Sequence, residues 1–228
     1  MENGLAEEDI LLIKKPRGIT SFDVVRKIRT RLGVKKVGHA GTLDPMAEGL
    51  LIVGIGSGTK KLGRFLKLPK SYKAQVFFGT RTDTGDCTGK VLEEKEISEI
   101  DPDVFRRCLK GLLGKLVIPV PAYSAIKVQG RKLYTRARRG EVFTPPVREM
   151  EIIKIELLKM TSRSKGVEAE LLIHVSSGTY IRSIAEELGR RLGLPATLSG
   201  LTRETIGNYL LEDAVEVGDL KSSYFSKK

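Results

Sequence analysis

The sequence holds few of the residues that build metal centres and disulfides. Among its 228 residues are two cysteines, two histidines and no tryptophan. Cys87 and Cys108 lie 21 positions apart, without the C-x-x-C spacing of a zinc site, and two histidines cannot complete a ligand set with them. The sequence therefore predicts a reduced, metal-free cytoplasmic protein.

Long hydrophobic runs are also missing. The longest apolar stretches, such as GLLIVGIG at 49–56, fall well short of the roughly 18 residues that a membrane span requires. The first ten residues are acidic rather than basic, unlike the start of a signal peptide. We expect neither a transmembrane helix nor a signal peptide, and no membrane partner.

Acidic residues are scarce along three stretches of a chain that carries a net charge of +12. Residues 14–36 hold nine basic side chains and one acid, and residues 60–73 and 127–139 each hold six basic side chains and no acid. Each cluster alone is typical of a solvated face. Three clusters in one chain favour a basic surface that binds a nucleic acid.

Hydrophobic periodicity predicts both helices and strands. Segments 20–33, 103–114 and 179–193 have helical spacing, the first with Thr20 as its cap and Gly33 as its end. Segments 72–79 and 167–175 alternate as strands do, and 148–160, which fits either period, is read as a strand because of its isoleucines. Strands outnumber helices without regular alternation, which favours an α+β fold around a mixed or antiparallel central sheet flanked by helices.

Residues 119–146 are bounded by prolines and rich in arginine and lysine. This segment, called the arm below, is either an ordinary surface hairpin with a short helix or a basic insert that clamps a nucleic acid. No low-complexity linker or repeat divides the chain, so we expect a single domain over 1–228.

The stretch GHAGTLDPMAEGLLIVGIG, from Gly38 to Gly56, places His39 and Asp44 among glycines just ahead of an apolar run. Gly38 and Gly41 permit tight turns and a close approach to the backbone. By sequence alone, Asp44 followed by Pro45 is typical of a helix cap, and a single histidine is more often structural than catalytic.

Five segments resemble one family in order and spacing. GHAGTLDPMAEGLLIVGIGSGTK, SYKAQVFFGTRTDTGDCTG, PAYSAIKVQGRKLY, SSGTYIRSIAEELG and LTRETIG are similar to the bacterial tRNA pseudouridine-55 synthases, the TruB-like family. The resemblance runs from about Ile10 to Ala214, and the GHAGTLDP block is highly specific. It implies the pseudouridine synthase fold and isomerisation of uridine 55 in the T-arm loop of tRNA.

The resemblance also implies a role for each matched residue. The catalytic residues would be Asp44 as the aspartate that attacks the uridine or steers its sugar, Tyr72 as the tyrosine that stacks on the flipped base, and Arg182 as the arginine that pairs with the aspartate. The substrate-binding residues would be His39, Tyr180, Leu201, Asp86 and Lys127. Isomerising a base within folded RNA requires extracting it from its stack, and these residue types suit that task.

The isomerisation conserves every atom of the uridine, so we expect no cofactor. The expected partner is the T-arm stem-loop of tRNA rather than DNA, and the expected state is a monomer. Members of this family usually continue into a small C-terminal RNA-binding domain of the PUA type, whereas this sequence stops after DLKSSYFSKK. The resemblance therefore predicts a single catalytic domain without a separate PUA domain.

Several alternatives remain open on the sequence. Arg182 could pair with Glu186 on a solvent-exposed helix, and Tyr72, Tyr180 and Leu201 could be ordinary core residues. An RNA-binding module without chemistry, or a glycoside-type hydrolase that uses Asp44 with a second carboxylate, are the rival functions. The intact set of Asp44, Tyr72 and Arg182 speaks against the first, and the basic surface against the second.

Overall fold

A computed structural model describes residues 5–128 and 130–220. Part of the acidic N-terminus, one residue of the arm and the last eight residues lie outside the described residues. The described chain forms two compact units. Unit 1 comprises the residues up to Lys73 and those from Leu201 onward, and unit 2 comprises Ala74–Gly200. No helix within the described ranges is long and apolar enough to cross a membrane.

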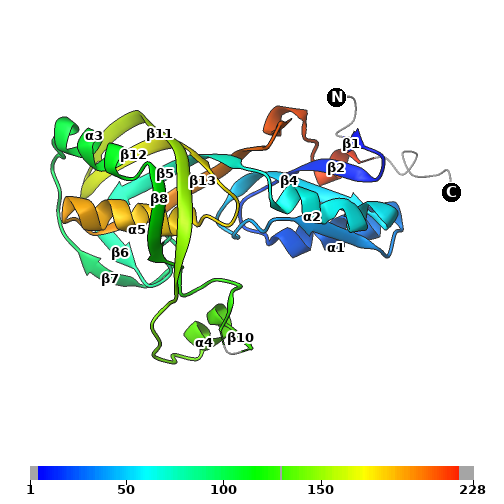
Figure 1. Ribbon diagram of the computed structural model, residues 1–228, viewed down its shortest axis with the longest axis horizontal. Helices are drawn as coiled ribbons and strands as arrows, with labels where there is room; N and C mark the ends of the chain where they lie inside the picture. The colour runs from blue at the N-terminus through cyan, green and yellow to red at the C-terminus, as the bar shows by residue number, and fades with distance from the viewer. Residues whose placement is uncertain (1–4, 129, 221–228) are drawn as a thin grey trace. The chain divides into compact units, whose positions relative to one another are not determined.

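Unit 1 is built on strands from both ends of the chain (Figure 1). Its elements are β1 (Leu5–Glu7), β2 (Ile10–Lys15), α1 (Ser21–Leu32), β3 (Val37–Ala40), β4 (Glu48–Ile55), η2 (Gly56–Lys61), α2 (Leu62–Leu66), the start of β5 (Lys70–Phe78), the end of β13 (Ala196–Ile206), β14 (Tyr209–Leu210), η3 (Leu211–Asp213) and η4 (Val217–Asp219). Strand β4 pairs with β2 and β3 in antiparallel fashion and with β13 in parallel.

The strands of unit 1 bury both of their faces. Leu11 and Ile13 of β2 pack with Val24, Val25 and Ile28 of α1. The alternate residues of β2 face the other way and pack in a cluster that contains Leu62 and Phe65 of α2. Because helices cover both faces, the run GLLIVGI in β4 is continuously apolar rather than alternating.

Helix α1 begins and ends where its sequence predicts. The Thr20 side chain accepts a hydrogen bond from the Asp23 backbone, and the Asp23 carboxylate accepts one from the Thr20 backbone, which completes a capping box. Gly33 ends the helix in the left-handed conformation at φ 67°.

Strands β4 and β13 approach very closely at one point. Gly49 pairs with Arg203, and a Cβ added to Gly49 would lie 2.5 Å from the Arg203 carbonyl oxygen. Gly49 also has φ +110°, a conformation that side chains disfavour. Only glycine fits this position.

Unit 2 holds the remaining elements (Figure 1). They are most of β5, β6 (Thr80–Thr82), β7 (Val91–Glu94), α3 (Pro102–Gly111), β8 (Gly114–Pro119), β9 (Lys127–Val128), β10 (Arg131–Lys132), α4 (Leu133–Arg138), β11 (Val147–Arg163), β12 (Gly166–Val175), α5 (Ile181–Leu192) and the start of β13. Strands β5, β12, β11 and β8 lie in that order in the sheet.

The core of unit 2 lies between this sheet and its helices. Phe78 of β5 and Phe105 of α3 are fully buried, and their rings meet edge to face with centroids 5.7 Å apart. The arm, green in Figure 1, leaves the sheet between β8 and β11 and carries the β9–β10 hairpin and α4.

The predicted elements are confirmed, and the largest differences in their boundaries, three residues each, are at the ends of α3 and β11. Segment 148–160 forms the long strand β11, as predicted. Helix α3 ends at Gly111, three residues earlier than predicted, and Leu112 and Gly114 follow it as a cap and a left-handed turn. The parallel pairing of β13 with β4 beside antiparallel neighbours gives the mixed sheet of an α+β fold. The single domain over 1–228 stays a prediction.

We expect Gly49→Ala to destabilise the protein strongly, because the new methyl group would clash with the backbone of Arg203 at a strained φ. Strain and overpacking together should cost roughly 2–5 kcal/mol, which lowers the melting temperature by about 5–15 °C in a chain of this size. Calorimetry measures this shift. Gly218→Ala is the control, since nothing lies within 4 Å of its added Cβ. Equal melting temperatures for the two variants would contradict the close approach.

Candidate functional site

Asp44 lies in the segment 41–47, which connects β3 to β4 in unit 1. Residues 45 and 46 form a turn in which the Ala47 amide donates to the Asp44 carbonyl at 3.0 Å, and no helix follows. The interpretation of Asp44 as a helix cap is therefore wrong. Its side chain is half-buried, so the carboxylate meets both protein and solvent.

The backbone of this segment is held by groups from β2, α1 and the turn between them. The Ser21 hydroxyl donates to the Leu43 carbonyl at 3.1 Å and accepts from the Leu43 amide at 2.9 Å. The Gly18 amide donates to the Pro45 carbonyl at 2.8 Å, and the Arg17 guanidinium to the Met46 carbonyl at 3.0 Å. These bonds fix the position of Asp44 without using its side chain.

Two buried cations, Lys15 and Arg203, also donate hydrogen bonds to this segment and to its neighbours. Lys15, 1% exposed, donates from Nζ to the Ala47 carbonyl at 2.6 Å and to the Pro16 carbonyl at 2.9 Å. Arg203, also 1% exposed, donates from Nη2 to the Gly41 carbonyl at 3.1 Å and from Nε to the Leu50 carbonyl at 2.7 Å. Buried charges of this kind are tolerated because their donors are satisfied.

These cations sit close enough to influence one another. The pKa of Lys15 is lowered to about 8, mainly by burial; the Asp44 carboxylate opposes this shift and the Arg203 charge adds to it. Burial, with Arg203 as the second cause, also lowers the pKa of Lys70 to about 8. Asp44 therefore lies within electrostatic reach of Lys15, as do Arg203 and the acidic side chain of Glu48.

His39 precedes the segment on β3. Burial lowers the pKa of its imidazole, and the Arg203 charge lowers it further, so the ring is neutral at neutral pH. Its Nδ1 atom is buried and has no hydrogen-bond partner among the described residues. A buried nitrogen without a partner is uncommon in folded proteins.

Tyr72 and Leu201 belong to unit 1 and are both 8% exposed. In β5, Lys70, Tyr72 and Ala74 follow the alternation of a strand with one buried face. Their burial fits the core alternative and leaves the ligand role a prediction.

Arg182 opens α5 in unit 2 and is 5% exposed. Its Nη1 donates to the Thr84 carbonyl at 2.7 Å, its Nη2 donates to the Tyr123 carbonyl at 3.0 Å, and its Nε lies 3.8 Å from the Asp86 carboxylate. The alternative of an exposed helix pair with Glu186 is therefore wrong, because the guanidinium is buried.

Asp86 is held by its own loop. Its carboxylate accepts hydrogen bonds from the Thr84 hydroxyl at 3.0 Å and from the Thr88 amide at 3.0 Å and hydroxyl at 2.6 Å. Glu186 packs beside this loop, with its carboxylate 3.2–3.3 Å from where a Cβ on Gly85 would lie. Burial raises the pKa of Glu186, and the Arg182 charge partly offsets that rise.

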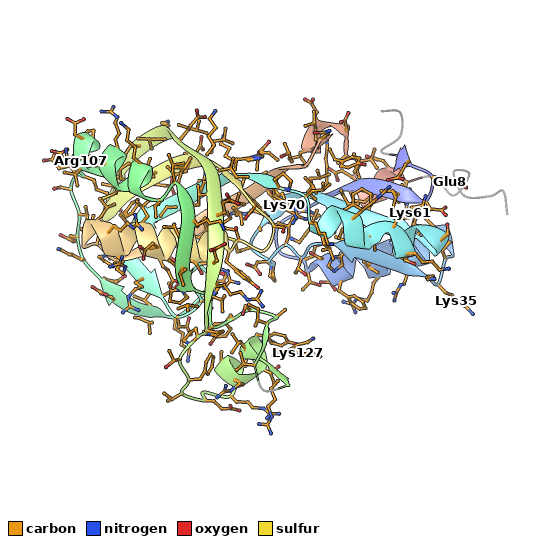
Figure 2. All side chains as sticks on the ribbon, viewed as in Figure 1. Glu8, Lys35, Lys61, Lys70, Arg107 and Lys127 are labelled. Atoms are coloured by element: carbon orange, nitrogen blue, oxygen red, sulfur yellow. The ribbon has the colours of Figure 1, made fainter. Side chains whose placement is uncertain are left out.

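Of the other two predicted residues of unit 2, Tyr180 directly precedes α5 and Lys127 belongs to the arm. Tyr180 packs against a buried cluster that includes Leu133 of α4 and Met150 of β11. Lys127 is exposed at the start of β9, and Figure 2 labels it on the arm. It pairs directly with Lys132 of β10, which places two like charges side by side.

The structure groups the predicted residues within each unit. In unit 2 it brings Arg182 and Asp86 together. In unit 1 it links His39 and Asp44 to the buried cations Arg203 and Lys15, neither of which the sequence predicted. Their signal in the sequence is a charged residue at a position where strand alternation calls for a buried side chain. Among the described residues, no group of three or more histidine, cysteine or acidic side chains could hold a metal ion.

Comparison with known proteins identifies the relatives of this chain. Residues 29–181 match the family described as TruB family pseudouridylate synthase (N terminal domain). A tRNA pseudouridine synthase B of Corynebacterium efficiens is 37% identical over 98% of this chain and 75% of its own length. One of Aquifex aeolicus is 41% identical over 93% of this chain and 73% of its own length.

Solved structures are also similar. The Cbf5-Nop10-Gar1 complex contains a chain with a TM-score of 0.70 and 25% identity over 95% of this chain. A second, the archaeal box H/ACA sRNP Nop10-Cbf5 complex, gives 0.65 and 26% over 92%. This chain spans 54% and 51% of those two chains. The expected pseudouridine synthase fold is confirmed.

We expect stability to depend on Lys15 as the pH rises. Its folded-state pKa of about 8 lies below the ordinary 10.5, so between these values the unfolded state binds more protons and stability rises with pH. Lys15→Met removes this contribution. The difference in urea-unfolding free energy, wild type minus variant, should therefore increase from pH 7.5 to pH 10. A difference that stays constant would mean that Lys15 titrates normally.

Proposed function

This chain belongs to the TruB family of pseudouridylate synthases, and we propose that it isomerises uridine 55 in the T-arm loop of tRNA to pseudouridine. The relatives are named for action on tRNA, and the net charge of +12 suits a polyanionic substrate. The observation that carries the proposal for the site is the half-buried Asp44 carboxylate on a segment whose backbone accepts hydrogen bonds from the buried cations Lys15 and Arg203.

The proposed reaction exchanges one bond of the uridine for another. The bond between ribose C1′ and uracil N1 breaks, the detached uracil turns, and a bond from C1′ to C5 forms. The hydrogen on C5 is lost and N1 gains one, so all atoms balance and neither an oxidant nor a cofactor is consumed. Asp44 acts at the target uridine as the nucleophile or as the group that steers the sugar.

Arg182 is proposed to stabilise the ionised form of the catalytic aspartate. Its two carbonyl contacts and the nearby Asp86 carboxylate hold the guanidinium in a single orientation. Asp86, itself held by the Thr84 and Thr88 hydroxyls, is proposed as an acidic member of this network. A buried and fixed charge stabilises a reacting group more effectively than a solvated one.

Four residues are proposed to receive the extruded nucleotide. Tyr72 would stack on the uracil, and Tyr180 and Leu201 would contact the nucleotide beside it. His39, a half-buried side chain, would lie near the extruded base as a neutral ring. A neutral imidazole can both accept and donate a hydrogen bond, which suits a base edge better than a phosphate.

The arm is proposed to clamp the T-arm stem-loop through its basic side chains. Lys127 faces Lys132 across the β9–β10 hairpin, and Arg131 precedes Lys132. Like charges directly opposite one another destabilise a strand pair in the free protein. A phosphate between them would relieve that repulsion, which favours the arm as a contact for the RNA backbone.

Asp44→Asn should abolish pseudouridine formation while the dissociation constant for tRNA stays within about tenfold of wild type. The amide retains the shape of the side chain but has no negative charge for the chemistry. Mapping pseudouridine by chemical adducts in an unmodified transcript, with filter binding in parallel, measures both effects. The control is Asp219→Asn, an exposed acid of the same unit. Product formed by Asp44→Asn at the wild-type rate would remove Asp44 from the mechanism.

Substitution of Lys127, Arg131 and Lys132 by glutamine should weaken tRNA binding and reduce the slope of log affinity against log salt by about one unit per lost phosphate contact. This slope is measured by filter binding at salt concentrations from about 50 to about 300 mM. Lys90, Lys95 and Lys110, exposed lysines of the same unit, form the matched triple control. Identical slopes for the two triple variants would exclude the arm as a phosphate contact.

A further inference from the structure

Arg203 is a buried cation with an unusual set of contacts. It is 1% exposed on β13, and its guanidinium donates to the carbonyls of Gly41 and Leu50. Those two residues bound the ten-residue stretch that contains Asp44. A single side chain therefore binds both ends of the catalytic segment.

The backbone of Arg203 reinforces these side-chain bonds. Arg203 pairs with Gly49 in the parallel β4–β13 ladder, and the missing side chain at Gly49 lets the two backbones approach closely. The Arg203 Nη1 atom also lies 3.5 Å from where a Cβ on Gly41 would be. Gly49 thus makes room for this residue, whereas a Cβ on Gly41 would make only an ordinary van der Waals contact with it.

We propose that Arg203 is a positioning residue that clamps the two ends of the segment 41–50 and thereby sets the geometry in which Asp44 meets the target uridine. This inference rests on the proposed function. Arg203 would not touch the RNA. It would act through the backbone of the segment, because a displacement of about 1 Å at a reacting group can cost on the order of a hundredfold in rate.

The same guanidinium acts on His39 as a charge. Burial lowers the pKa of His39, and Arg203 is the charged group that lowers it further. Other charged side chains lie on the elements packed against β3. They include Arg29 of α1, which donates to the Val37 carbonyl, and Lys60 and Lys61 of η2. Arg203 therefore has two effects: it holds the segment that carries Asp44, and its charge favours the neutral form of His39.

Two substitutions separate these effects. Arg203→Lys keeps the positive charge but loses the planar fork that reaches two carbonyls, and Arg203→Gln loses the charge as well. Lys70→Met is the matched control, because Lys70 is a buried cation of the same unit that donates to the carbonyls of Leu66 and Leu68, outside 41–50. Figure 2 labels Lys70.

The rate of a single turnover on tRNA should fall about 10–100-fold in Arg203→Lys, with tRNA affinity within about threefold of wild type. Amide hydrogen exchange across 41–50 should be faster in this variant and unchanged in Lys70→Met. A wild-type rate in Arg203→Lys, or an equal loss in Lys70→Met, would overturn the proposal.

Proton NMR of the histidines tests the electrostatic part, because the chain has only His39 and His174. Removing a positive charge makes protonation easier, so the His39 pKa should rise in Arg203→Gln and stay near the wild-type value in Arg203→Lys. The His174 signal, from unit 2, is the internal reference. An unchanged His39 titration in Arg203→Gln would contradict the coupling.

Amide hydrogen exchange of the wild-type protein tests the clamp without requiring that a variant folds. A clamped segment 41–47 should exchange slowly, whereas exchange as fast as that of an unstructured peptide would overturn the clamp. A wild-type protein that forms no pseudouridine would contradict the proposed function, and the exchange and NMR experiments would still decide the role of Arg203.

Discussion

The close parallel contact between β4 and β13 is the constraint on which unit 1 depends. Arg203 enters the interior with a full charge, and it is stable there because its donors reach the carbonyls of Leu50 and Gly41. That reach requires the backbones to approach to a distance that only Gly49 permits. One glycine therefore allows a buried cation to fix the segment that carries Asp44.

Buried positive charge organises unit 1 in a way that ordinary core packing would not. Lys15 and Arg203 donate to backbone carbonyls rather than to acidic side chains. The Asp44 carboxylate remains half-buried and interacts electrostatically with Lys15. The charge of Lys15 therefore lies within electrostatic reach of the carboxylate that is proposed to act on the uridine.

Unit 2 uses a different means to hold its charged groups. Arg182 donates to two carbonyls, one in the loop that contains Asp86 and one at Tyr123, near the start of the arm. The Tyr123 hydroxyl donates to Asp83 of the same loop at 3.3 Å. The loop, the start of the arm at Tyr123 and the start of α5 are therefore held together by hydrogen bonds. The exposed basic β9–β10 hairpin lies further along the arm.

The sequence alone determined the helices, the long strands, the α+β class and the family, because these follow from local periodicity, capping residues and a specific GHAGTLDP block. It left open whether the sheet is mixed or antiparallel, and the parallel pairing of β4 with β13 decided that. The resemblance also predicted Asp44 as the catalytic residue, which stays a prediction, and local signals wrongly suggested a helix cap there and an exposed pair for Arg182. Only the tertiary structure decided that Arg182 is buried and that Lys15 and Arg203 bind the Asp44 segment. The physical reason is that burial of a charge is compensated by carbonyls up to 162 positions away, and no local pattern encodes that distance.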